Sequence, residues 1–185
     1  SRSLVGSEMC IRDRFYKDKS KWFDGLIGLW NMKKKSSPNP DNTHGLQDYM
    51  VSGGDDCFKA PLLARKNSIY PNDEEIKIIE YYLENYVWGK HQRTDEEKPY
   101  PYVIHGGENW YVNRNNKIGF GSGGLGQDRM WRSFDYPHLV LVYLKMYEIA
   151  KNYPNKCNYL TFDQYLERAY RTAVAYFEVP IAIEM

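Results

Sequence analysis

The sequence predicts a mainly α-helical protein, and three stretches carry that prediction. Apolar side chains recur at helical spacing after Asn72, Asp135 and Thr161, and each of these residues is a good helix N-cap. Pro154 follows the second stretch and Pro180 falls near the end of the third, where a proline would stop a helix. Because about eight residues separate the last two stretches, we expect those helices to form an antiparallel hairpin.

Residues 1–14 resemble a translated sequencing adaptor rather than a native segment. The resemblance lies in the run SLVGSEMCIRD, whose apolar residues are interrupted by Gly6, Glu8 and Arg12, unlike the continuous apolar core of a signal peptide. We therefore expect the native chain to begin near Phe15 and residues 15–185 to be a partial domain of a longer protein. Localisation stays open, because a leader can lie outside the sequence.

The next segment, up to residue 73, carries few regular signals. Residues 15–32 mix aromatic and charged side chains, which predicts either a short amphipathic segment or a strand pair. Several prolines and the GGDD cluster at 53–56 follow, so we expect irregular chain with at most one short helix, between Pro61 and Asn67. The two glycines predict a tight turn that presents the adjacent carboxylates of Asp55 and Asp56.

The three helices can be placed from their ends. The first is expected from Asp73 to Trp88, with Asn72 as its N-cap. The second runs from residue 136 to residue 153 after the N-cap Asp135, and its body is apolar nearly all round, as in a helix enclosed by others. The third opens with Thr161 and Gln164 at capping-box spacing and is expected to stop before Pro180.

A long connection, residues 89–134, separates the first and second helices, and a connection of this length is usually functional. It contains the GxGxxG pattern at 119–124, but no βαβ unit surrounds that pattern, so we reject a dinucleotide site and predict a flexible loop. Aromatic residues gather in this polar, glycine-rich stretch. Flat rings among polar side chains suit a sugar-binding cleft, although the same rings could instead cover the helical core from outside.

Composition limits the possible partners. The 185 residues are 42% hydrophobic, and no run approaches the roughly 20 apolar residues that would span a bilayer. With 25 basic and 24 acidic residues, the chain gives no electrostatic reason to expect nucleic acid. Cys57 and Cys157 lack metal-ligand spacing, so no metal or cofactor is predicted, and we favour two separate thiols over a disulfide.

Two carboxylates are the candidate catalytic groups, Asp56 and Asp135. Paired carboxylates suit glycosidic chemistry, in which one group protonates the leaving oxygen while another activates water or attacks the sugar. Each has an alternative role. Asp56 could accept hydrogen bonds from the backbone of its own turn, or it could ligate calcium, although the spacing matches no known calcium loop. Asp135 could cap the second helix without any catalytic role. The candidate substrate-binding residues are aromatic, basic or imidazole side chains of the long connection and of the start of the second helix: Tyr102, His105, Trp110, Arg129, Trp131, Arg132 and Tyr136.

Several motifs together resemble an uncharacterised domain family of large bacterial and fungal proteins that are similar to the six-hairpin glycosidases. The segments that carry the resemblance are YVWG at 86–89, QRTD at 92–95, PYPY at 99–102, WRSFDYPH at 131–138 and YLERAY at 165–170. The resemblance covers most of residues 22–180 and implies part of an (α/α)6 toroid, whose end loops form a carbohydrate cleft.

The resemblance implies a function as well as a fold. It suggests a piece of a secreted carbohydrate-active enzyme that hydrolyses or cleaves a polysaccharide or oligosaccharide, with a carbohydrate substrate and no membrane insertion. The alternative is a non-catalytic carbohydrate-binding or scaffold domain. Three helices cannot close a toroid, so such a fragment is expected to expose apolar helix faces.

Overall fold

The computed structural model describes residues 15–28, 53–104 and 135–182, and within them the chain is mainly helical, as predicted. The helices are α2 (Gly53–Ile69), α3 (Asp73–Tyr82), α6 (Asp135–Asn152) and α7 (Phe162–Ala182). A π-helical turn, η2 (Leu83–Val87), continues α3. Isolated β-bridges are the only strand-like pairings among the described residues.

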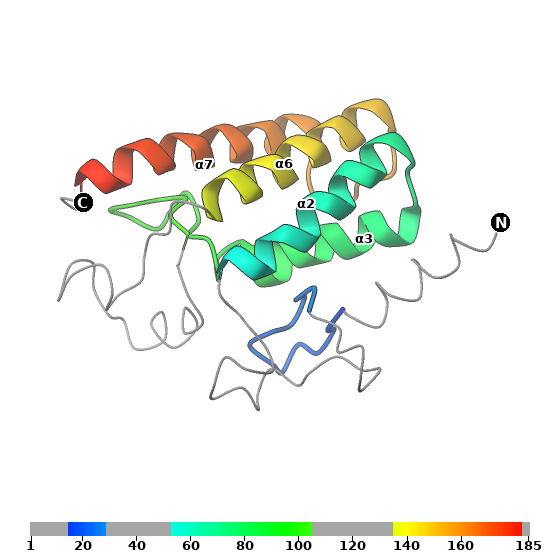
Figure 1. The fold of residues 1–185 in the computed structure, drawn as a ribbon, viewed down its shortest axis with the longest axis horizontal. Coiled ribbons are helices and arrows are strands. Elements are labelled where there is room, and N and C mark those ends of the chain that lie inside the picture. Colours follow the sequence, from blue (N-terminus) through cyan, green and yellow to red (C-terminus); the bar gives the residue numbers. More distant parts are fainter. Residues whose placement is uncertain (1–14, 29–52, 105–134, 183–185) are drawn as a thin grey trace.

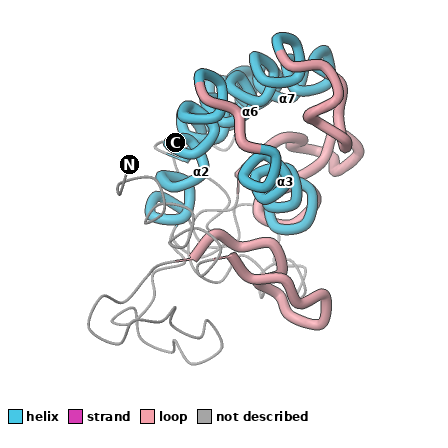
Figure 2. Tube along the Cα trace, turned by 90° about the vertical axis from the view of Figure 1, so that its right-hand side faces the viewer, coloured by secondary structure: helices cyan, strands magenta, loops and turns pink. Residues whose placement is uncertain are grey.

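The helices form one bundle in which α6 packs between α7 and α2, and α2 also contacts α3. Figure 1 shows α6 and α7 running antiparallel, which is the predicted hairpin, and Figure 2 shows the helices nearly end-on. Helix α2 runs in the direction of α6, and α3 runs back in the direction of α7 (Figure 1). Loops at the two ends therefore join neighbouring helices.

Side-chain caps fix the starts of α3 and α7 as the sequence predicts. The Asn72 side chain accepts hydrogen bonds from the backbone N–H groups of Glu74 and Glu75, both at 3.1 Å. At α7, the Gln164 backbone N–H donates to Thr161 Oγ1 at 3.3 Å, and the Thr161 N–H donates back to Gln164 Oε1 at 2.9 Å. This reciprocal pair is a capping box.

Helix α2 corrects the prediction of a mostly irregular segment with a GGDD turn. The helix is 17 residues long, begins at Gly53 and includes Pro61. Its buried positions, Ala60, Leu63, Ala64 and Asn67, have the i, i+3, i+4, i+7 spacing of one helical face. Burial of that face against α6 outweighs the local preference of glycine and proline for a turn.

Helix α7 corrects a second expectation, that the third helix ends before Pro180. It continues through Pro180 to Ala182. The proline nitrogen cannot donate to the preceding turn, which weakens the helix at that point. The buried face of α7 nevertheless extends to Val179, which is 4% exposed, so packing continues up to the residue before the proline.

Residues 15–28 form a narrow loop against α3, closer to the strand-pair alternative than to a helix. Phe15 and Ile27 make an antiparallel bridge, and the Tyr16 N–H donates to the Leu26 carbonyl at 3.0 Å. Gly25 has a φ of +90°, and a Cβ atom there would lie 3.2 Å from the Tyr81 carbonyl oxygen. Glycine therefore meets both a conformational and a steric need at this turn.

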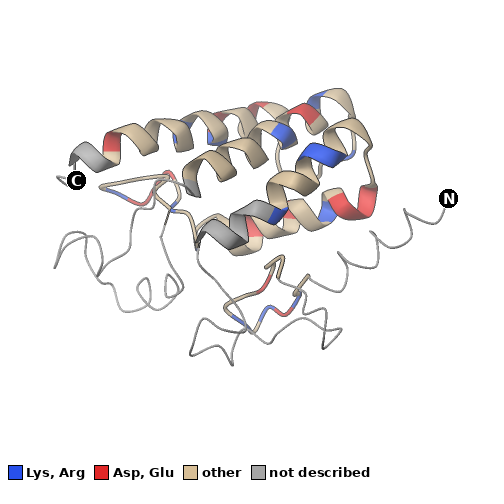
Figure 3. Ribbon diagram, in the orientation of Figure 1, with Lys and Arg blue, Asp and Glu red and all other residues tan. Residues whose placement is uncertain are grey.

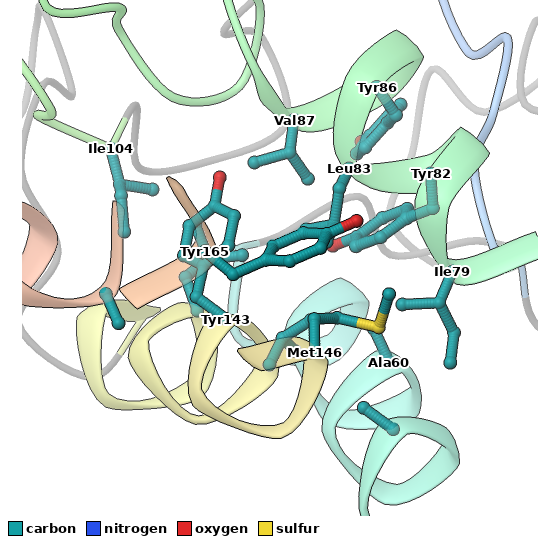
Figure 4. Packing of buried hydrophobic residues seen from close by; sticks show 14 of the residues in the cluster. Ala60, Ile79, Tyr82, Leu83, Tyr86, Val87, Ile104, Tyr143, Met146 and Tyr165 are labelled. Carbon is teal, nitrogen blue, oxygen red and sulfur yellow. The ribbon is translucent and has the colours of Figure 1, made fainter. Parts of the chain in front are cut away.

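Large tyrosines fill the core between α3 and the α6–α7 hairpin. Tyr82, Tyr86, Tyr143 and Tyr165 are fully buried, and Figure 4 shows them together with Met146 in the space between the helices. The rings of Tyr82 and Tyr86 stack with their centroids 5.7 Å apart. These four tyrosines therefore serve packing.

Helix α7 also carries an exposed apolar stripe. Phe162, Leu166, Tyr170 and Phe177 are 40% to 68% exposed and are spaced by four, four and seven residues, which places them on one side of the helix. Single exposed apolar residues are normal, but a row of large ones is less so. None of the described helices combines the length and apolarity needed to cross a membrane.

Candidate functional site

One end of the bundle brings together several of the segments that the sequence singled out. Figure 1 shows the loop that follows η2, the first turns of α2 and α6, and the last turns of α7 at this end. The first turn of α2 carries Asp56, and Asp135 is the first residue of α6. The topology therefore places the backbones of both predicted carboxylates at the same end as Tyr102.

The loop at 88–104 is held by its own polar contacts. Gln92 bridges both Trp88 and Ile104, and the Arg93 N–H donates to the Val103 carbonyl at 2.8 Å. The Arg93 guanidinium donates to the carbonyl of Glu97 at 2.9 Å and to that of Lys98 at 3.0 Å. These hydrogen bonds hold the loop in one conformation beside α7.

Gln92 anchors this loop to the core. Its side chain is fully buried, and its Nε2 atom donates to the Tyr102 carbonyl at 3.1 Å and to Thr172 Oγ1 at 2.7 Å. Its Oε1 atom accepts from the Tyr143 hydroxyl at 2.8 Å. Tyr102 has a φ of 62°, a backbone conformation that non-glycine residues seldom adopt. The glutamine thus holds the carbonyl of a residue in an unfavourable conformation.

Arg168 joins η2 to α7 beneath the loop. The guanidinium carbon lies 3.8 Å from the centroid of the Trp88 ring, and Nη1 is 2.5 Å from Glu84 Oε1. Trp88 in turn packs against Tyr102, with ring centroids 5.4 Å apart. Because Arg168 is only 9% exposed, its stacking and ion pair are shielded from water.

A cleft of about 630 Å³ lies between the loop and α7. Its polar and aromatic lining consists of Asp95, Lys98, Tyr100, Tyr102, Glu167, Arg171 and Glu178, and prolines 99 and 101 and small apolar residues of α7 complete its walls. Figure 3 shows acidic and basic residues along α7.

The charges of the cleft are unequally paired. Arg171 Nε lies 2.7 Å from Glu167 Oε1, so these two groups neutralise each other. Asp95 and Glu178 form no salt bridge or hydrogen bond through their carboxylates with the described part of the chain. Burial, with the nearby carboxylates of Asp95 and Glu167, raises the pKa of Tyr102, so its hydroxyl is neutral and can donate a hydrogen bond at neutral pH.

The predicted binding residues meet different outcomes. Tyr102 lines the cleft, although it is only 9% exposed and its ring packs against Trp88. Tyr136 is 1% exposed, contacts Tyr176 and accepts a hydrogen bond from the Ile104 N–H at 3.2 Å, so it packs in the core and ties down the end of the loop. The remaining candidates lie outside the described residues: His105, Trp110, Arg129, Trp131 and Arg132.

The two predicted catalytic residues can be placed by backbone alone. The side chains of Asp56 and Asp135 are outside the described part of the structure, as are the GxGxxG segment and residues 1–14. Sequence reasoning missed Asp95, Glu167, Arg171 and Glu178. The four-residue spacing of Glu167 and Arg171 was a visible signal of a shared helix face, but nothing local indicated that loop 95–102 would cover that face.

Within the described ranges, no group of three or more histidine, cysteine or acidic side chains could hold a metal ion. Cys157 is a free thiol, and burial, followed by the nearby Glu80 carboxylate, raises its pKa to about 12. The candidate site therefore consists of carboxylates, cations and tyrosines.

Comparison with known proteins gives a family and no function. Residues 33–183 match DUF5695, a family of unknown function. No curated protein and no protein of solved structure matches the chain. The match spans most of the sequence, including the loop and all of the helices described above. The chain therefore belongs to the DUF5695 family.

Proposed function

We propose that this chain is part of a carbohydrate-active enzyme that cleaves a polysaccharide or oligosaccharide by carboxylate acid/base chemistry. The observation that carries the proposal is the cleft between loop 95–102 and α7, where tyrosines and three carboxylates line one concavity. Its volume of about 630 Å³ lies within the range of ligand-binding pockets. Tyrosine faces suit the C–H surfaces of sugar rings, and carboxylates accept hydrogen bonds from hydroxyl groups.

Spacing restricts which carboxylates can act together. Glu167 and Glu178 are eleven residues apart on α7, which corresponds to about 16 Å along the helix axis. The two carboxyl groups of a glycosidase are separated by about 5 to 10 Å. A productive pair therefore combines one α7 carboxylate with a group from another segment, and Asp95 lies on the opposite wall of the cleft.

Asp56 and Asp135 remain the proposed acid and base from the sequence. Both belong to first turns at the end of the bundle where the cleft lies (Figure 1). One group would protonate the glycosidic oxygen while the other activates water or attacks the sugar. Two sets of carboxylates are therefore candidates, Asp56 with Asp135 and those that line the cleft, and mutagenesis can assign the reaction to either.

The proposed architecture is a fragment of an (α/α)6 toroid. The exposed stripe of Phe162, Leu166, Tyr170 and Phe177 supports it, because each hairpin of a toroid packs against helices on both sides. A small-angle scattering profile of the complete protein, compared with that of a closed helical ring, tests this part of the proposal. A profile of an open or elongated particle would contradict it.

The functional experiment compares four single variants with the parent chain: Asp56→Asn, Asp135→Asn, Asp95→Asn and Glu167→Gln. Each is incubated with a panel of neutral and charged glycans, and new reducing ends and binding are measured separately. Loss of cleavage with retained binding identifies a catalytic carboxylate. Glu148→Gln is the control, because Glu148 pairs with Lys145 away from the cleft. Cleavage that survives all four substitutions, and Glu178→Gln as a fifth, would refute the carboxylate mechanism.

The second candidate is a non-catalytic carbohydrate-binding domain. It is favoured by the Glu167–Arg171 ion pair, which engages one carboxylate of the cleft without a substrate. Binding of a glycan without release of reducing ends from any member of the panel would support this function over the enzyme.

A further inference from the structure

A second cleft of about 580 Å³ lies on the face of α3 turned toward residues 15–17 and 158–159. Its lining shares no residue with the first cleft. Rings of Phe15, Tyr81 and Tyr159 contribute aromatic surface, and Glu80 contributes a carboxylate. None of the sequence motifs pointed to this region.

Glu80 is the unusual member of the lining, because it is fully buried and only half satisfied. Its Oε1 atom accepts hydrogen bonds from the backbone N–H groups of Asn158 at 2.8 Å and Tyr159 at 3.1 Å, and from the Tyr165 hydroxyl at 3.1 Å. Its Oε2 atom has no hydrogen-bond partner among the described residues. A carboxylate can accept about four hydrogen bonds, and a buried anion without compensation is costly.

The rings of the cleft already hold one cation. The Lys17 ammonium lies 5.1 Å from the centroid of the Tyr81 ring, but it forms no salt bridge with the buried glutamate. Tyr81 is fixed by its hydroxyl, which donates to the Asp24 carboxylate at 3.0 Å, and by edge contact with Phe15, whose ring centroid is 5.5 Å away. The aromatic surface is therefore preformed.

We propose that this cleft binds a primary ammonium group of a small ligand. The ammonium would donate to Glu80 Oε2 and lie against the aromatic rings, which supplies both the missing hydrogen bond and the missing positive charge. Lys77 is already paired with Glu74 at 3.0 Å and does not compete for Glu80. Lys17 does compete for the rings, so it acts as a built-in weak inhibitor of binding.

The ligand recognised by this cleft would be an aliphatic amine. Both an amino sugar and a diamine carry such a group. The test titrates the full chain with glucosamine, N-acetylglucosamine and 1,5-diaminopentane, at about pH 6 so that the free amines are protonated. Binding is followed by calorimetry and by protein NMR shifts. We expect binding of the two amines and none of the acetylated sugar. Binding of glucosamine alone identifies an amino-sugar site, and binding of both identifies a general amine site.

Two variants should shift the amine affinity in opposite directions. Glu80→Gln removes the charge and should weaken binding at least about tenfold, as expected for loss of a charge-assisted hydrogen bond. Its control is Glu75→Gln, also a buried carboxylate of α3, which already accepts from Lys66 and Asn67. Lys17→Ala removes the competitor and should tighten binding about two- to fivefold. Its control is Lys151→Ala, whose ammonium stacks on Tyr147 at 5.3 Å outside the cleft.

The Lys17→Ala variant still tests the proposal if Glu80→Gln fails to fold. Lys17 is exposed, so its substitution leaves the fold intact, and unchanged or weaker amine binding by Lys17→Ala would overturn the proposal. Equal binding of glucosamine and N-acetylglucosamine would also overturn it, since a hydroxyl group would then be the recognised donor. Because the readout is binding of a free amine, the result is independent of any glycan cleavage at the first cleft.

Discussion

Replacement of Gln92 by alanine tests whether the loop of the first cleft depends on one buried amide. The substitution leaves the Tyr143 hydroxyl without its acceptor and the Tyr102 carbonyl without its donor, both in the core. An orphaned buried polar group costs about 1 to 3 kcal/mol. Two such groups, at about 2 kcal/mol each, predict that the free energy of unfolding falls by about 4 kcal/mol.

Two milder variants calibrate this value. Thr172→Val removes one of the two acceptors of Gln92 Nε2 and leaves the Tyr102 contact, so it should lower the free energy of unfolding by only about 1 kcal/mol. Tyr143→Phe removes one donor and should fall between the two. Urea denaturation followed by tryptophan fluorescence gives all three values, provided that the slope with denaturant is unchanged.

The effect should also be local. Amide hydrogen exchange in residues 93–104 should accelerate more in Gln92→Ala than exchange in α6, because the loop loses its anchor first. A loss below about 1 kcal/mol for Gln92→Ala would refute the reasoning. Equal losses for Gln92→Ala and Thr172→Val would refute it as well, since one hydrogen bond would then account for the whole effect.

Single contacts elsewhere give further tests. Thr161→Ala removes the α7 cap and should lower the free energy of unfolding by about 1 kcal/mol in urea; an unchanged value would contradict a stabilising cap. Burial and the Asp24 carboxylate raise the pKa of Tyr81 from 10.0 to about 12. Between these values the unfolded state loses its proton first, so stability falls as pH rises, and Tyr81→Phe should flatten that fall in alkaline denaturation. With its pKa raised to about 12, Cys157 should react with iodoacetamide far more slowly at about pH 8 than an exposed cysteine, measured by peptide mass spectrometry. Alkylation as fast as that of glutathione would contradict this.

The helices that could be predicted are those whose starts are fixed by capping residues close to them in the sequence. Asn72 caps α3, and Thr161 with Gln164 caps α7, so three or four consecutive residues are enough to place each start. Helix α2 was missed because its glycines and Pro61 are local turn signals. Its helical face is stabilised only by packing against α6, which the local sequence does not show. The end of α7 was misplaced because the proline rule predicts a stop before Pro180, whereas the helix continues through it to Ala182.

The first cleft could not be predicted because its walls come from distant parts of the chain. Gln92 and Thr172, which hold those walls together, are 80 residues apart. The aromatic content of this region predicts both Tyr102 and Tyr136 as substrate-binding residues. Tyr102 does line the cleft, but Tyr136 is in the core. Aromatic content alone does not distinguish the two, because a ring in a loop becomes core or surface only when the other elements pack around it.

The π-helical turn at Leu83–Val87 takes up one more residue than a regular α-helical turn before the loop of the first cleft begins. Here the Trp88 N–H donates to the Leu83 carbonyl at 2.8 Å, five residues back rather than four. If the same sequence continued as a regular α-helix, the extra residue would rotate Trp88 by about 100° from its observed direction. Deleting one residue between 83 and 87 would let the same N–H reach the Leu83 carbonyl as a regular four-residue bond, so Trp88 would keep its place against Arg168. The wide turn thus sets the direction in which the loop leaves α3.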